Sequence, residues 1–159
     1  MNREEKLDWD REEFERIHDE IKDKDALSHY EFLRIRNFKL QNSTTENEEK
    51  INRITKKAFK LAEKGENIKE AIGTLSEGLN GVGVPIASTI LAMKFPNLFC
   101  IIDWRVIEEL GKKEEFKDYL TSPEIYEKYL MLMRKEAKSQ DIKLRDFERQ
   151  LFEKSVRKV

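Results

Sequence analysis

Two glycines, one residue apart, mark the segment of this chain that is best suited to bind a phosphate. The segment reads Leu79-Asn80-Gly81-Val82-Gly83 and lies between two stretches with helical patterns. Glycine lets the backbone turn sharply and come close to another molecule. The helix that follows would offer unpaired N–H groups and the positive end of its dipole. Together these features bind a phosphate without a basic side chain, so a nucleotide or a nucleic-acid backbone could be the partner.

The context of the glycines separates these options. A dinucleotide-binding fingerprint needs a strand before the glycines, whereas residues 68–78 have a helical pattern. A P-loop needs Gly-Lys-Ser or Gly-Lys-Thr, and the chain has neither. The remaining interpretation is a helix, a glycine hairpin and a second helix over about residues 68–94.

Composition favours a mostly helical chain. It has 159 residues, of which 40% are charged and 38% apolar, with six glycines and three prolines. The size suits one domain over 1–159. The net charge of −1 argues against a general polycation, but residues 50–94 carry eight basic and four acidic side chains. An anionic partner is therefore best sought there.

Cysteine content and the N-terminus limit the remaining classes. Cys100 is the only cysteine, which excludes an intrachain disulfide, a four-cysteine zinc site and a cysteine-ligated iron–sulfur cluster. His18 and His29 have no metal-ligand spacing, so we expect neither metal nor cofactor. No apolar run reaches the ~20 residues of a membrane span. The charged N-terminus is unlike a secretory signal, so we expect an intracellular protein without membrane contact.

The element pattern predicts an all-α fold of about seven helices in two small lobes, with a cleft lined by the hairpin and Asp103. Residues 41–47 are predicted to form a loop, and Thr45 with Glu48 a capping box. Asn67 is expected to cap a helix from residue 68, and Pro85 fits a helical first turn. Residues 98–102 form a short apolar run that predicts an extended segment. Two later helices are expected to start near Asp103 and near Ser122. The last helix is expected to run over about residues 143–156.

The hairpin, the small residues Ala87-Ser88 and the later Ile101-Ile102-Asp103 together resemble a known family. They are similar to the helix-hairpin-helix-GPD superfamily of base-excision DNA glycosylases, which includes endonuclease III, MutY and the 8-oxoguanine glycosylases. The family pattern has an aspartate some 20 residues after the hairpin, and Asp103 lies 20 residues after Gly83. The match covers roughly residues 75–105.

This resemblance implies a function and a set of residues. Asp103 would support a cationic sugar and activate water, in addition to capping a helix. Double-stranded DNA carrying a lesion or a mismatch would be the partner of a monomer. The DNA contacts would come from the hairpin and one arginine: Asn80, Gly81, Val82, Gly83, Val84 and Arg105.

Two departures from the family define the expected reaction. Bifunctional members have a lysine two residues after the second glycine, where this chain has Pro85. Several members also hold a four-cysteine iron–sulfur cluster near the C-terminus, which this chain lacks. The resemblance therefore implies a monofunctional enzyme that hydrolyses the N-glycosidic bond and leaves the strand intact.

Two other functions stay open at this stage. The chain could be a non-catalytic helix-hairpin-helix protein that binds DNA, or a helical interaction domain without nucleic acid. For single residues the simpler interpretations are a solvated basic face on residues 50–60, core or rim packing for Trp104, a buried thiol for Cys100 and a core stripe at Tyr126, Tyr129, Leu130 and Met133. Two of these features could instead take part in DNA binding: the basic face could flank the DNA, and Trp104 could stack on a base.

Overall fold

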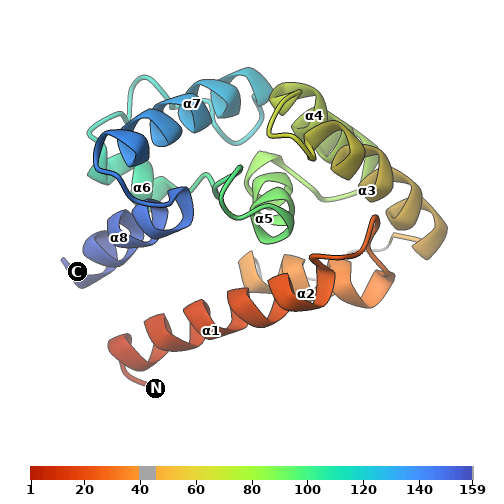
Figure 1. The fold of residues 1–159 in the computed structure, drawn as a ribbon, viewed down its shortest axis with the longest axis horizontal. Helices are drawn as coiled ribbons and strands as arrows, with labels where there is room; N and C mark the ends of the chain where they lie inside the picture. Colours follow the sequence, from red (N-terminus) through yellow and green to blue (C-terminus); the bar gives the residue numbers. More distant parts are fainter. Residues whose placement is uncertain (40–45, 159) are drawn as a thin grey trace.

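The computed structural model describes residues 1–39 and 46–158, and this part of the chain contains eight α-helices and no strand (Figure 1). The prediction of an all-α fold is confirmed. The helices are α1 (Arg3–Ile21), α2 (His29–Lys39), α3 (Glu48–Ala62), α4 (Ile68–Gly78), α5 (Val84–Lys94), α6 (Trp104–Glu109), α7 (Pro123–Ser139) and α8 (Leu144–Arg157).

Local capping signals explain where several helices begin. Ser122 accepts a hydrogen bond from the N–H of Ile125, and Pro123 takes the first helical position of α7, as predicted. Asn47 caps α3 by accepting from the N–H of Lys50 at 2.8 Å. The predicted capping residue Thr45 and most of the predicted 41–47 loop lie outside the described residues.

Asn67 occupies the N-cap position of α4, but the prediction that its side chain caps the helix is wrong. The residue has a left-handed backbone, with φ of 53°, and its side-chain amide donates to the carbonyl of Leu61 at 3.1 Å. Asparagine tolerates this conformation better than most residues. It therefore closes the turn after α3 instead of capping α4.

Helix α5 is the centre of the fold. Every one of its residues except Pro85 is buried, and it packs against α1, α2, α3 and α4. A helix that is apolar on all sides is stable only when other helices surround it. Figure 1 shows α5 in the middle, with α1 and α2 below it and α7 and α4 above. The start of this central helix is the point where the hairpin ends.

The apolar run before Asp103, predicted to be an extended segment, pairs with no strand among the described residues. Its backbone groups are instead bonded by side chains from three helices. Ser88 of α5 accepts from the N–H of Ile102 at 3.0 Å, and Glu148 of α8 accepts from the N–H of Ile101 at 2.6 Å. From α7, Tyr126 and Tyr129 donate to the carbonyls of Cys100 and Ile101, at 2.8 and 2.9 Å. These bonds fix the position of Asp103.

The described helices give no candidate for a membrane span, because none combines sufficient length with sufficient apolar character.

Candidate active site and nucleic-acid interface

Asp103 is the N-cap of α6, and both oxygens of its carboxylate are bonded. Oδ1 accepts from the backbone N–H of Arg105 at 2.8 Å, as the capping prediction requires. Oδ2 accepts from the Nζ of Lys39 at 2.6 Å. The side chains of Asp103 and Lys39 are 21% and 17% exposed, so the pair lies partly within reach of solvent.

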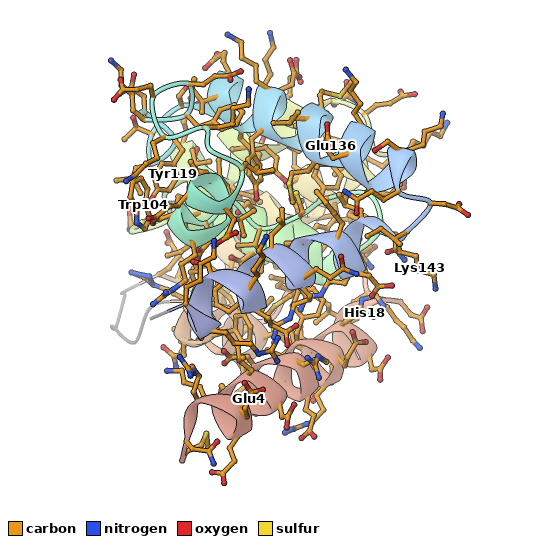
Figure 2. The ribbon with its side chains drawn as sticks, turned by 90° about the vertical axis from the view of Figure 1, so that its left-hand side faces the viewer. Glu4, His18, Trp104, Tyr119, Glu136 and Lys143 are labelled. Atoms are coloured by element: carbon orange, nitrogen blue, oxygen red, sulfur yellow. The ribbon has the colours of Figure 1, made fainter. Side chains whose placement is uncertain are left out.

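The pair lies on the wall of a cavity of about 390 Å³. This volume falls in the usual range of small-ligand pockets. The residues that line the cavity come from α1 and α2 on one side and from α6, α8 and the segment before α6 on the other. Figure 2 shows α1 below α8. Its apolar lining consists of Leu7, Phe38, Ile101, Val106, Phe152 and Val156. Its charged lining consists of Arg3, Lys6, Asp10, Lys39, Asp103, Arg105 and Glu148.

The cavity differs from the predicted cleft in one respect. Asp103 lines it, but none of the described residues on its wall comes from the hairpin. The hairpin precedes α5, whose first residue, Val84, bonds to Leu120 in the turn before α7. The hairpin therefore takes no part in this cavity, and a cleft lined by both the hairpin and Asp103 stays a prediction.

The hairpin has the backbone geometry that its glycines predict. Gly81 has φ of 69°, a left-handed conformation that favours glycine, and both Gly81 and Gly83 are exposed. Val82, between them, is buried and anchors the turn to the core. Within the described part of the chain, the backbone N–H groups of Gly81, Val82 and Gly83 donate no hydrogen bond. These three amides remain available to an anion.

Two other amides of the hairpin already have partners, which narrows the predicted contact surface. The N–H of Val84 donates to the carbonyl of Leu120 at 3.2 Å. The N–H of Asn80 donates to Oε2 of Glu46 at 2.9 Å. Backbone contacts from Asn80 and Val84 to a phosphate would require these bonds to break.

Glu46 places a negative charge beside the hairpin. Its side chain is 3% exposed and its Oε2 also lies 3.2 Å from the Nζ of Lys50. The hydrogen bond from Asn80 is the main reason that the pKa of Glu46 is lowered, with Lys50 contributing. The start of α3, which carries the predicted basic face, therefore adjoins the hairpin. Glu46 itself opposes the approach of a phosphate.

The turn that contains Tyr119 and Leu120 connects the hairpin to Asp103. Leu120 bonds the start of α5 through its carbonyl, and 56% of the residue is exposed. Burial raises the pKa of Tyr119, and the charge of Asp103 raises it further, which reflects the proximity of the two groups. Figure 2 shows Tyr119 and Trp104 at the same edge of the molecule.

Trp104 and Arg105 extend this edge. Trp104 is 43% exposed, so of the two predicted positions, core or rim, it occupies the rim. The Nζ of Lys113 lies 4.8 Å from the centre of its ring. Arg105 is exposed, and its guanidinium forms no ion pair with the described residues. A cation without a protein partner at this position is able to contact a phosphate.

Pro85 stands where bifunctional glycosylases have a nucleophilic lysine, so another lysine near Asp103 would have to supply the amine. Pro85 has no amine, and Lys94, at the other end of α5, donates to the carbonyls of Ile21, Lys22 and Lys24. It closes the C-terminus of α1 and lines no part of the cavity that contains Asp103. Lys39 is the lysine that contacts Asp103, and no local sequence signal connects positions 39 and 103.

Tyr126, Tyr129, Leu130 and Met133 are fully buried, so the core stripe is confirmed. Cys100 is also fully buried, and burial raises its pKa well above the ordinary value. Nδ1 of His18 lies 2.6 Å from the carbonyl of Met93.

Comparison of the chain with models of known protein families, with curated proteins and with solved structures finds no match.

Proposed function

We propose that this chain is a monofunctional DNA glycosylase that acts as a monomer on double-stranded DNA and hydrolyses the N-glycosidic bond of a damaged or mispaired base. The observation that supports it most is the placement of the Asp103 carboxylate on the wall of a cavity of about 390 Å³, at the start of α6. The resemblance of residues 75–105 to the glycosylase superfamily adds to this argument.

In the proposed reaction, the target base leaves the duplex and enters the cavity, while its sugar stays at the wall. Base-modifying enzymes need this extrusion because the reacting atoms are shielded in a stacked helix. Asp103 then stabilises the positive charge that develops on the sugar and accepts a proton from the attacking water. Lys39 and the N–H of Arg105 hold the carboxylate in place.

In the same proposal, the hairpin holds the DNA backbone. The amides of Gly81, Val82 and Gly83 point to one phosphate, with Arg105 as a cationic contact nearer the cavity. Contacts of this kind position the protein without selecting a sequence. The affinity is expected to fall with rising salt, because phosphate contacts release counterions.

A second candidate function is DNA binding without catalysis, and the Lys39–Asp103 ion pair favours it. Both carboxylate oxygens of Asp103 are occupied, so the group serves a structural purpose even in the absence of a substrate. The hairpin surface would then act alone. This candidate predicts the same salt-dependent binding but no release of any base.

One experiment separates these functions. Purified protein is incubated with duplexes that carry oxidised, alkylated, deaminated or mismatched bases, and the strands are treated with alkali to reveal abasic sites. Alkali-dependent cleavage by the parent, with loss in Asp103→Asn, supports the glycosylase. Salt-dependent binding without cleavage supports the binding protein. Absence of salt-dependent DNA binding overturns both proposals and leaves a helical interaction domain.

A further inference from the structure

A second carboxylate, Asp10 of α1, lines the same cavity as Asp103. It is partly buried, and within the described residues its side chain makes neither a hydrogen bond nor an ion pair. Other carboxylates of this region are occupied. Glu148 accepts from the N–H of Ile101 and from Arg145, and Asp103 accepts from Arg105 and Lys39. Asp10 is thus the cavity acid without a structural partner in the described chain.

The charged groups around Asp10 come from four helices. Arg3 and Lys6 belong to α1, Lys39 to α2, Asp103 and Arg105 to the start of α6, and Glu148 to α8. Arg149 of α8 acts on Asp10 through its charge, but its guanidinium is used elsewhere. Its Nη2 donates to the carbonyl of Leu7 at 3.3 Å, and its Nε lies 3.5 Å from Glu153.

These surroundings favour the protonated form of Asp10. Burial raises the pKa of its carboxyl, and the charges of Arg149 and Lys6 lower it by less, so the net pKa is raised. The carboxylate of Asp103, unlike that of Asp10, accepts hydrogen bonds from an ammonium and from a backbone N–H. Two carboxyl groups in one pocket with different surroundings take different roles in acid–base catalysis.

We propose that Asp10 is the proton donor to the departing base, while Asp103 serves the sugar and the water. The inference rests on the proposed glycosylase function and adds a second catalytic residue to it. It also assigns the cavity a preferred substrate class, namely neutral bases that leave poorly unless a proton reaches a ring nitrogen or an exocyclic oxygen.

The proposed step is balanced in atoms and charge. The bond between C1′ and the base nitrogen breaks, and its electron pair goes to the base, which takes the proton of the Asp10 carboxyl. Water adds to C1′ and gives one proton to the Asp103 carboxylate. Solvent then returns a proton to Asp10 and removes one from Asp103. The products are the free base and an intact strand with an abasic sugar.

The test measures single-turnover base release by the full chain from duplexes carrying uracil, 8-oxoguanine, adenine opposite 8-oxoguanine, or 7-methylguanine. The last base carries a positive charge and leaves without an added proton. Asp10→Asn is expected to slow release of a neutral base by ~10²–10⁴-fold, the contribution of a positioned acid. It should slow release of 7-methylguanine far less. Asp8→Asn is the matched control, because Asp8 is an exposed carboxylate on the same helix.

The pH profile gives a readout that a structural role would not move. With a neutral base, release by the parent should fall as the pH rises through the raised pKa of Asp10, because the proton donor is then lost. The release rate of Asp10→Asn should not show this fall with rising pH, and Asp10→Glu should recover part of the parent rate. The parent profile needs no variant, so it decides the question even if Asp10→Asn does not fold.

The outcomes separate the two proposals. Equal rates and equal pH profiles for the parent and Asp10→Asn would overturn the role of Asp10 and leave the glycosylase in place. An equal loss on neutral and charged bases would also overturn it. Release of no base from any duplex by the parent would overturn the glycosylase itself and this inference with it.

Discussion

The ammonium of Lys39 lies 2.6 Å from Oδ2 of Asp103, which joins the last residue of α2 to the residue that starts α6. The two residues are 64 positions apart in the sequence. Their ion pair is partly shielded from solvent and lies on the wall of the cavity. It defines the charge state of the candidate site, because a negative carboxylate and a positive ammonium meet where the sugar is expected to bind.

The first prediction concerns the carboxylate of Asp103. Asp103→Asn keeps the side-chain oxygen that caps α6 but removes the negative charge. Base release should fall by roughly 10²–10⁴, because the reaction needs the charge. DNA binding should stay nearly unchanged, because the cap of α6 is kept and the proposed backbone contacts come from the hairpin and Arg105. Single-turnover release and a binding titration measure the two effects. Asp118→Asn, at an exposed position, is the control. Release at the parent rate would reduce Asp103 to a helix cap.

The second prediction concerns covalent chemistry. The Lys39 ammonium donates a hydrogen bond to Asp103 and, in this charged form, has no lone pair for attack on a sugar carbon. Borohydride should therefore trap no protein–DNA adduct with the parent, and the product should be an abasic strand that alkali cleaves. If an adduct forms in the parent and disappears in Lys39→Gln, Lys39 is the nucleophile and the monofunctional assignment is wrong.

The third prediction tests the hairpin. Gly83 has an ordinary backbone φ of −88°, and an added Cβ would lie 3.4 Å from the Leu120 carbonyl, which allows a side chain there. Gly83→Asp adds a negative charge at the proposed phosphate contact, and Gly83→Asn adds nearly the same shape without it. The aspartate variant should lose at least ~10-fold more affinity than the asparagine variant, equally for all DNA sequences. Equal affinities would remove the hairpin from the DNA surface.

The fourth prediction concerns Glu46, whose carboxylate accepts the N–H of Asn80. Glu46→Ala removes this acceptor of the Asn80 N–H and a negative charge next to the hairpin. DNA binding should become a few-fold tighter and depend more steeply on salt. Glu49→Ala removes an exposed carboxylate three residues further on, in the first turn of α3, and serves as the comparison. Weaker binding in Glu46→Ala alone would mean that Glu46 shapes the hairpin for its partner.

The fifth prediction is one of stability. Ser88→Ala removes the hydroxyl that accepts the N–H of Ile102, and leaves this buried group without a partner. The free energy of unfolding should fall by ~1–3 kcal/mol. Ser139→Ala, on the exposed end of α7, should change it by less than ~0.5 kcal/mol. Denaturant unfolding followed by circular dichroism measures both. A loss below that of Ser139→Ala would show that water replaces the hydroxyl.

Local signals were sufficient for the parts of the fold that lie close together in the sequence. The bounds of α4 and α5, the buried Val82 between two exposed glycines and the cap at Asp103 follow from patterns within a few residues. Lys39, Glu46 and Asp10 could not be found in this way. Their roles depend on the packing of α1, α2 and the start of α3 against distant segments, and no periodicity encodes such partners.

The apolar run before Asp103 shows a second reason why sequence patterns do not predict the whole structure. Five consecutive apolar residues fit a buried strand as well as any buried segment. A strand needs a neighbouring strand, and the described chain supplies only helices. The backbone of Ile101 and Ile102 is therefore satisfied by side chains instead of a ladder. Only the positions of Ser88, Tyr129 and Glu148 in space reveal this, since each lies on a different helix.

This bonding by distant side chains has a consequence for the order of folding. The segment before Asp103 has no helix or strand of its own and becomes ordered only when α5, α7 and α8 have docked around it. Contacts that form after the helices have assembled have low φ-values. Mutations at Ser88 or Tyr129 should then accelerate unfolding and leave the folding rate nearly unchanged. The carboxylate of Asp103 would be among the last groups to reach its native position.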